Sequence, residues 1–317
     1  MFIDPLYNSI KGALFGAAVG DALGSPLKSM TVDKIQANFD YVSEMIGGGT
    51  MCTLPGNITD ETQLMLMVAE SMAQENADPI LIFCQKLLIW YSLYPKDISM
   101  NTEDTLRRVK HRQEVYNSVG DTYPIGVEQW LLSAMETTQA NAFGTEHADV
   151  LSRAIFPPLY CADAELAANR VGMFVRLTHN DNTIAQEAIY FSNILHQIVD
   201  KQEKGVSLDI VRNTVMCTPF LIDKELKDPK PTIVNVMNNA LFALFNTETY
   251  EDCVIKVINL GICTNTMGSV AGALAGALYG FTNIKKDFIN KLPHMYIKRL
   301  ENAANVAHKA RLTEFCM

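Results

Sequence analysis

The sequence predicts one all-α domain, and three observations support this expectation. Apolar residues recur at three- and four-residue spacing along most of the 317 residues, which is the repeat of a helix with one buried face. No segment shows the strict alternation of apolar and polar residues that predicts a half-buried strand. No low-complexity linker divides the chain, and hydrophobic residues make up 48% of it, enough for a sizeable core. We therefore expect a single helical domain over residues 1–317.

The expected helices follow this spacing in chain order, and loops are expected where Gly and Pro interrupt it. The helices are predicted at residues 8–24, 62–75, 79–94, 126–138, 162–178, 183–203, 231–246, 250–259, 266–280 and 295–312. The interrupting loops are predicted at residues 47–49, 55–56, 157–158 and 228–231.

Two of the expected helices, 8–24 and 266–280, carry a glycine at every fourth residue. Four-residue spacing puts each set of glycines on one helix face, where a second backbone can approach closely. An interior Gly costs a helix about 1 kcal/mol relative to Ala, so these glycines need a packing reason. We expect the two helices to pack tightly in the core and to hold their N-terminal starts rigidly beside one another. The glycines lie at positions 12, 16, 20, 24, 268, 272, 276 and 280.

Composition excludes several classes of partner. The net charge of −9 argues against a general nucleic-acid binder and against an anionic-membrane binder, because both reward basic surfaces. The uncharged stretch between Lys256 and Lys285 is long enough to span a bilayer, but its polar residues and glycines favour a buried helix. Seven scattered cysteines without a C-x-x-C pair indicate free thiols in a reducing compartment. The first residues lack a basic n-region, and we expect a cytoplasmic protein without a signal peptide.

Thr59, Asp60 and Glu61 directly precede an apolar helix and are the first candidate site. A hydroxyl and two carboxylates at a helix N-terminus are hard oxygen ligands that suit Mg²⁺ or Mn²⁺. Thr59 or Asp60 could equally be an ordinary N-cap, with acids favoured in the first turn of any helix. The residues alone leave both interpretations open.

Several segments together resemble the ADP-ribosylglycohydrolase family. The resemblance is carried in the family's order by the Gly-Asp-Ala-Leu-Gly-Ser-Pro segment within 12–26, the segment 47–63, Ala69-Glu70-Ser71, Leu177-Thr178-His179 and the Gly-rich run 261–280. It covers nearly the whole chain. It implies a compact all-α fold and, in active members, a pair of divalent cations. Those members hydrolyse the bond between ADP-ribose and a protein side chain or a small acceptor.

The resemblance also marks where this chain departs from the family. Its second metal-binding segment resembles Gly-Gly-Asp-x-Asp-Thr, and here Cys263 and Asn265 stand where aspartates are expected, while Thr266 keeps its type. Lys28 stands where many relatives carry a glutamate, although a shift of its loop would leave it a solvated lysine. Cys263 is a soft thiol and a poor ligand for a hard cation.

The charge balance decides the metal prediction. Asp60 and Glu61 are the acids left in the expected site, and Lys28 brings the opposite charge. Two divalent cations would then be buried without compensation, which costs several kcal/mol or more. We predict that the paired-metal site is absent and that at most one Mg²⁺ binds, held by Thr59, Asp60, Glu61 and Thr266. Alternatively, the Lys28 ammonium replaces a cation by pairing with Asp60 or Glu61.

The resemblance assigns further residues to the ligand. Gly47, Gly48 and Gly49 could let the backbone approach a ribose, or could form a plain turn. Ala148-Asp149 replaces an Asn-Gly that cradles phosphates in relatives, and Asp149 would repel a pyrophosphate. His179 matches a position near the nucleotide, although a lone helical His is often simply buried.

Two functions remain open from the sequence. The first is a family member that lacks glycohydrolase activity and binds ADP-ribose, an ADP-ribosylated protein or another protein partner. The second is an active hydrolase with one cation, in which Asp60 or Glu61 orients water towards the anomeric carbon. We favour the first because the departures at Lys28, Cys263 and Asn265 fall together in the expected site.

Overall fold

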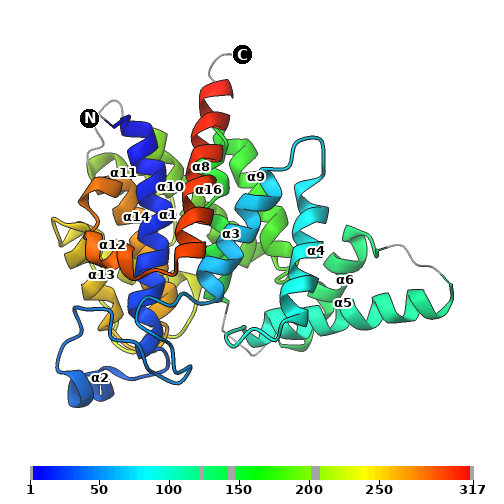
Figure 1. Cartoon of the computed structure of the whole chain (residues 1–317), viewed down its shortest axis with the longest axis horizontal. Helices are drawn as coiled ribbons and strands as arrows, with labels where there is room; N and C mark the ends of the chain where they lie inside the picture. Colours follow the sequence, from blue (N-terminus) through cyan, green and yellow to red (C-terminus); the bar gives the residue numbers. More distant parts are fainter. Residues whose placement is uncertain (1–2, 121–123, 142–146, 201–207, 315–317) are drawn as a thin grey trace.

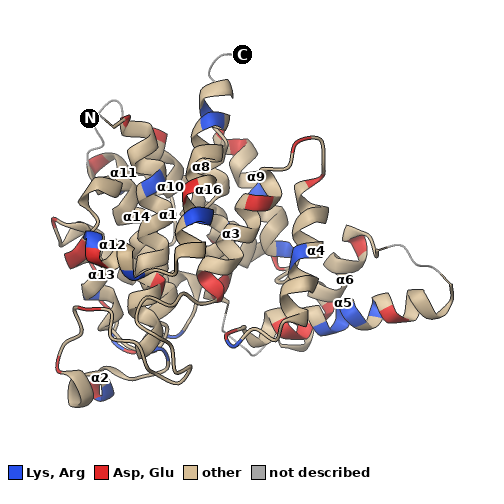
Figure 2. Cartoon of the chain, viewed as in Figure 1, with Lys and Arg blue, Asp and Glu red and all other residues tan. Residues whose placement is uncertain are grey.

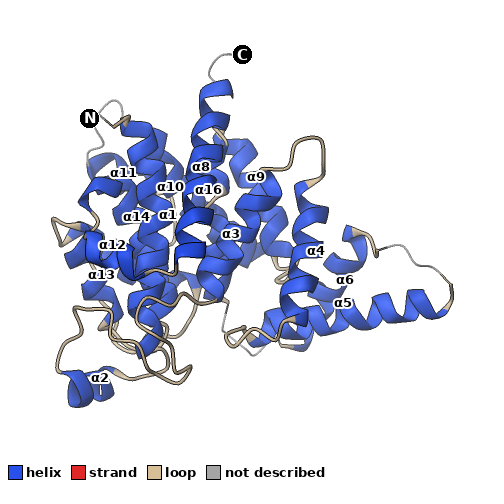
Figure 3. Cartoon of the chain, in the orientation of Figure 1, coloured by secondary structure: helices blue, strands red, loops and turns tan. Residues whose placement is uncertain are grey.

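The computed structural model describes residues 3–120, 124–141, 147–200 and 208–314. Over these ranges the chain folds into helices joined by loops and contains no β-strand, only one isolated bridge between Gly48 and Thr53 (Figure 3). The predicted all-α class is therefore confirmed. The last residues of the helix predicted at 183–203 lie outside the described residues. No described helix is long and apolar enough to cross a membrane.

The helices alternate with short turns along the chain (Figure 1). The first half contains α1 (Pro5–Gly24), η1 (Ser25–Leu27), α2 (Val32–Phe39), α3 (Asp60–Met72), α4 (Pro79–Ser92), α5 (Met100–Ser118), α6 (Val127–Ala140), η2 (Ala148–Val150), α7 (Leu151–Ala154) and α8 (Pro157–Tyr160). The second half contains α9 (Ala164–Arg176), α10 (Asn182–Asp200), α11 (Leu208–Val215), α12 (Ile233–Phe245), α13 (Tyr250–Ile258), α14 (Thr264–Tyr279), η4 (Phe281–Asn283), α15 (Lys286–Lys291) and α16 (His294–Glu314).

The fold differs from the sequence-based expectation in several places, and the short helices α2, α7, α11 and α15 all lie outside the predicted ranges. Pro157 and Pro158 open the short helix α8 instead of forming a loop, because proline is tolerated in the first turn, where its missing N–H has no partner to lose. Helix α5 lies where no helix was predicted. It is strongly polar and buries few apolar side chains, chiefly Leu106 and Val109, so the apolar repeat is too sparse to predict it.

The centre of the molecule is the antiparallel pair α1 and α14. Gly12, Gly16 and Gly20 face Gly276, Gly272 and Gly268 in that order, and Gly24 faces the Thr264 carbonyl. A Cβ added to any of these glycines would collide with the opposite backbone. The predicted close packing is therefore confirmed. The expectation that both helices start at the same place is wrong, because the C-terminal end of α1 lies beside the start of α14.

The remaining helices are arranged around this pair. Helices α3 and α16 pack against α1, while α12 and α13 pack against α14. Helices α4, α5 and α6 extend to one side of the body, with α5 reaching furthest from it (Figure 1). The C-terminal end of α1, the N-terminal end of α14 and the N-terminal end of α3 meet, and the candidate site forms at their junction.

Candidate functional site

Helix α3 supplies the acidic part of the site. Thr59 is its N-cap, with its hydroxyl accepting a hydrogen bond from the Glu61 N–H at 3.3 Å, so the capping interpretation is confirmed. Asp60 and Glu61 follow in the first turn, and both side chains are buried. The cap does not exclude a functional role, because Thr59 and Asp60 also line one cavity and Asp60 and Glu61 line another.

Asp21 of α1 fixes the start of α3 and is a site residue that the sequence analysis missed. Its carboxylate accepts hydrogen bonds from the Thr59 hydroxyl at 2.7 Å, the Thr62 hydroxyl at 2.6 Å and the backbone N–H groups of both threonines at 2.9 and 3.2 Å. Burial nevertheless raises the pKa of Asp21 to about 6. A single acid inside the apolar run of the first predicted helix was the available signal, because a buried acid requires partners.

Helix α14 supplies the neutral part of the site. The Thr264 hydroxyl donates to the Gly24 carbonyl at 2.7 Å, which ties the start of α14 to the end of α1. The Asn265 side-chain amide donates to the Thr59 hydroxyl at 3.2 Å. The Thr266 hydroxyl donates to Glu61 Oε1 at 2.5 Å. The first turn of α14 therefore hydrogen-bonds to the first turn of α3.

Cys263 is also at this junction. Its side chain is buried and lines the cavity that contains Asp60 and Glu61. The thiol lies 3.9 Å from the Pro229 carbonyl, a distance typical of a weak sulfur hydrogen bond. In this contact the thiol donates its proton to a carbonyl, which does not fit a role as a thiolate ligand.

Lys28 lies inside the site and is not a solvated loop residue. Its ammonium forms an ion pair at 2.5 Å with Asp97, so the expectation of a pair with Asp60 or Glu61 is wrong in its partner. Burial opposes the charge of Lys28, but the carboxylates of Asp60, Asp97 and Glu61 outweigh it and raise the pKa of the ammonium group. Lys28 therefore stays charged at neutral pH among three carboxylates.

Asp97 is the second site residue that the sequence analysis missed. It lies in the irregular segment between α4 and α5, where no periodic pattern or motif identified it. Besides the Lys28 ion pair, its carboxylate accepts a hydrogen bond from the Asn265 amide at 3.3 Å. An aspartate at position 265 would repel Asp97, whereas the asparagine amide donates to it.

Asp60 and Glu61 retain oxygen atoms that no described group satisfies. Burial raises the pKa of both carboxyl groups well above the ordinary range, and the neighbouring acids raise them further. Asp60 Oδ1, Glu61 Oε2 and Asn265 Oδ1 are buried and have no hydrogen-bond partner among the described residues. Buried acceptors of this kind need a hydrogen-bond donor, an ordered water or a cation.

Asp149 and His179 lie on the other side of the same region. Asp149 accepts hydrogen bonds from Ser99 at 2.9 Å, Thr102 at 3.0 Å and Arg153 at 3.3 Å. Burial opposes its charge, but His179, Arg153 and these hydroxyls outweigh burial and lower the pKa of Asp149.

The His179 ring is 3.7 Å from Asp149 Oδ1, and burial lowers its pKa to about 4, so the ring is neutral at neutral pH. Its other ring nitrogen contacts the Thr178 hydroxyl at 3.0 Å. His179 is thus fully buried, whereas Asp149 lines the cavity with its charge already partnered by Arg153. The expected repulsion of a pyrophosphate by Asp149 is correspondingly weaker.

Two cavities of about 220 Å³ each meet at Asp60 and Asp97, which line both. One also contains Lys28, Glu61, Asp149 and Thr266, and the other contains Thr59 and Lys96.

Gly47, Gly48 and Gly49 line neither cavity and all have positive φ angles, between 66° and 93°. They shape the loop that places Met51, Cys52 and Thr53 on the wall of the second cavity. In the part of the chain that the structure describes, no group of three or more His, Cys, Asp or Glu residues is arranged to hold a metal ion.

Comparison with known proteins gives consistent matches. A family model described as ADP-ribosylglycohydrolase matches residues 3–314. The chain is 27% identical over 290 residues to the ADP-ribosyl-dinitrogen reductase glycohydrolase of Rhodospirillum rubrum, covering 90% of this chain and 91% of that protein. It is 26% identical over 310 residues to the ADP-ribosylarginine hydrolase Tri1 of Serratia proteamaculans, covering 94% and 78%.

A viral relative and a solved structure extend these matches. The putative ADP-ribosyl glycohydrolase L543 of Acanthamoeba polyphaga mimivirus is 32% identical over 329 residues, covering 92% of this chain and 90% of the viral protein. A solved chain described as an ADP-ribosylglycohydrolase-related protein complex is similar with a TM-score of 0.74 and 22% identity, covering 97% of this chain and all of that one. At this identity the structural match supports the fold alone.

Proposed function

The chain belongs to the ADP-ribosylglycohydrolase family, and from this premise we propose that it binds an ADP-ribose-related ligand or an ADP-ribosylated protein without hydrolysing it. The observation that carries the proposal is the Lys28 ammonium, paired with Asp97 at 2.5 Å and attracted by Asp60 and Glu61. A fixed positive charge stands among the carboxylates that would otherwise face divalent cations.

The residues present do not fit a pair of divalent cations. A hard dication requires several charged oxygen ligands, and α14 offers an asparagine, a threonine and a thiol at its start. Lys28 and Arg153 already compensate Asp97 and Asp149. Bringing a dication next to the Lys28 ammonium would add like-charge repulsion in a buried site. We infer that the paired cation site of the family is absent.

The same geometry suits a hydroxyl-bearing ligand. Asp60, Glu61 and Asn265 each keep an oxygen acceptor that has no hydrogen-bond partner among the described residues, and ribose hydroxyls are donors. A carboxyl group of raised pKa can also carry a proton, so Asp60 or Glu61 can accept from one ligand oxygen and donate to another. Binding would then require no metal.

The test is calorimetric titration of ADP-ribose into the full chain, once with Mg²⁺ and once with EDTA. The proposal expects equal binding in both conditions and no release of ADP-ribose from ADP-ribosylated arginine. This substrate is tried first because one relative is named an ADP-ribosylarginine hydrolase. Binding in Mg²⁺ alone, or Mg²⁺-dependent release of ADP-ribose, would overturn it. Binding in neither condition would also overturn the ligand part of the proposal and leave a protein-binding role.

A second candidate is a hydrolase that uses one Mg²⁺. The three unpartnered oxygens of Asp60, Glu61 and Asn265 favour it, because they could also ligate one cation with Thr59 and Thr266 beside them. Bound Mg²⁺ would supply charge stabilisation, and Asp60 or Glu61 would orient the attacking water. The Mg²⁺ arm of the titration separates this candidate from the first.

A further inference from the structure

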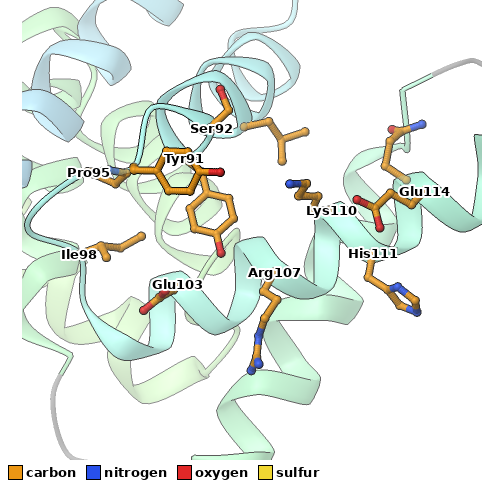
Figure 4. A pocket seen from close by; sticks show the side chains of 12 residues that line it. Tyr91, Ser92, Pro95, Ile98, Glu103, Arg107, Lys110, His111 and Glu114 are labelled. Carbon is orange, nitrogen blue, oxygen red and sulfur yellow. The ribbon is translucent and has the colours of Figure 1, made fainter.

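A larger hollow lies outside the junction of α1, α3 and α14. It has a volume of about 830 Å³ and lies between the end of α4 and one face of α5 (Figure 4). This volume is in the range of pockets that bind small organic ligands. It is several times larger than either cavity of the candidate site. We call it the α4–α5 groove.

The end of the groove near α4 is apolar and aromatic. Tyr91, Pro95 and Ile98 gather there (Figure 4), and Tyr94 also lines the groove. Tyr94 is 88% exposed and has a φ of 54°, a left-handed conformation that is strained for a bulky residue. Strained backbone of this kind clusters at ligand clamps and other functional sites. This end offers faces on which a planar ring can stack.

The charged wall of the groove comes from one face of α5. Lys110 points between the tyrosine end and the far end, where Glu114 and His111 lie, while Glu103 lies below the tyrosines (Figure 4). Among the described residues Lys110 has no ion-pair partner, whereas Arg107 pairs with Asp104 at 2.5 Å. Figure 2 shows that basic residues cluster along α5 more densely than on the neighbouring α4. An unpaired ammonium beside an aromatic floor can neutralise an anionic group carried on a planar ring.

We propose that the α4–α5 groove binds a mononucleotide, with the base against Tyr91 and Tyr94 and the phosphate at Lys110. Charge complementarity favours this class, because the Lys110 ammonium is exposed and has no ion pair among the described residues, so a phosphate can pair with it directly. Glu103 lies at the base end, where an exocyclic amine or a ribose hydroxyl can donate to it. A long nucleic acid is disfavoured by the net charge of −9.

The groove also borders the candidate site. Pro95 lines both the groove and the cavity that contains Thr59, while Ile98 lines both the groove and the cavity that contains Lys28. Asp97, the partner of Lys28, lies between them in sequence. A nucleotide in the groove would therefore contact the segment that positions the Lys28–Asp97 pair. The proposal does not depend on the ligand proposed for that site.

The probe is AMP, titrated into the full chain in EDTA. We expect saturable binding that Lys110→Glu and Tyr94→Ala each weaken about tenfold, the scale of one lost phosphate contact or one lost base stack. Both side chains are exposed, so neither change disturbs the core. Tyr94→Gly provides a second variant, because glycine accepts the positive φ without strain. Inorganic phosphate should bind far more weakly than AMP, since it lacks the ring.

Two controls locate the site. Lys309→Glu makes the same charge change on the exposed surface of α16 and should leave AMP binding unchanged. Lys28→Gln changes the neighbouring cavity and should weaken AMP binding far less than Lys110→Glu does if AMP occupies the groove. No saturable binding, an equal loss in Lys309→Glu, or a loss in Lys28→Gln with the groove variants unaffected would each overturn the proposal. None of these results depends on whether ADP-ribose binds or is hydrolysed.

Discussion

The first turns of α3 and α14 face one another across the candidate site, yet they differ in charge. Helix α3 starts with Thr59, Asp60 and Glu61, and α14 starts with Thr264, Asn265 and Thr266. Both turns use side chains to hydrogen-bond with the opposite turn. The acids of α3 are favoured by the helix dipole, while α14 offers hydroxyl and amide groups at the same kind of terminus.

The difference shows how a neutral helix start and a lysine can partner an acidic helix start. Asn265 donates to Asp97, Thr266 donates to Glu61, and Lys28 neutralises Asp97. Each contact brings a hydrogen-bond donor or a positive charge to an acid. The neutral turn of α14 and Lys28 together lower the free-energy cost of burying the acids of α3. The predictions below test how these two turns are held together and what each contributes.

The largest effect is expected from separating the two turns. Gly20→Ala places a Cβ against the Gly268 carbonyl, where α1 and α14 approach most closely. The helices must move apart, and we expect a loss of about 3–5 kcal/mol in the free energy of unfolding. Chemical denaturation measures it. Gly126→Ala is the control, because no atom lies within 4 Å of its added Cβ. Equal stability of both variants would mean that the helices are not packed as described.

The next effect concerns the anchor of the acidic turn. The pKa of Asp21 is about 6 in the folded protein and 3.8 in its ordinary state, so the folded state binds a proton more tightly than the unfolded chain. Its contribution to stability is complete below about pH 4 and is lost as the pH rises to about 6, by about 3 kcal/mol. We expect Asp21→Asn to abolish this part of the pH dependence.

The measurement is the free energy of unfolding at pH 4.5 and at pH 7 for the wild type and Asp21→Asn. Asp60 and Glu61 also have raised pKa values and titrate in both proteins; the charge of Asp21 is one of the causes that raise them, so its removal also takes away part of their pH dependence, in the same direction. Identical pH slopes would contradict the assignment of the shift to Asp21.

The acidic turn could be recognised from the sequence, but its anchor could not. Thr59, Asp60 and Glu61 form a continuous motif before an apolar helix, and so do the residues at the start of α14. Asp21 and Asp97 act through contacts between segments that are far apart in the chain. Asp21 is 38 residues from its partner Thr59, and Asp97 is 69 residues from its partner Lys28. Local patterns carry no information on such pairs, which is why Lys28 was assigned the wrong partner.

In the fold, too, local patterns were predicted from the sequence, whereas the arrangement of distant segments was not. Helices with an apolar stripe were predicted because burial imposes the spacing, and the glycine repeats correctly predicted the contact of α1 with α14. The direction of that contact was not predictable, because a glycine face permits both parallel and antiparallel packing. Helix α5 was missed because tertiary contacts at a few residues stabilise an otherwise polar helix.

The third prediction concerns a variant in which the first turn of α14 becomes acidic like the first turn of α3. Lys28→Glu with Cys263→Asp and Asn265→Asp returns three acids to the junction of α1, α3 and α14, and we expect the variant to bind Mg²⁺ where the wild type does not. At a Mg²⁺ concentration of 100 times Kd the bound ion would stabilise the fold by about 2.7 kcal/mol. Calorimetry and thermal unfolding with and without Mg²⁺ measure both quantities.

A matched control separates site formation from net charge. Cys217→Asp, Asn302→Asp and Lys309→Glu make the same three changes at exposed positions away from the site. This control should show no saturable Mg²⁺ binding. If the first triple variant folds and still binds no Mg²⁺, the three residues do not surround one cation position.

The smallest effect is expected from the single hydrogen bond that joins α14 to Glu61. Thr266→Val keeps the shape of the side chain but removes the hydroxyl that donates to Glu61 Oε1 at 2.5 Å. Leaving a buried carboxyl oxygen unpaired should cost about 1–2 kcal/mol, and Thr266→Ser should recover most of it. Because this hydrogen bond lowers the pKa of Glu61, its loss should raise that pKa further above the ordinary range. The valine variant should therefore keep Glu61 protonated to higher pH than the serine variant does, as carboxyl-resolved NMR titration can measure. Equal titration of the two variants would mean that α14 does not tune the acid of α3, and that the two turns share a cavity without acting on each other.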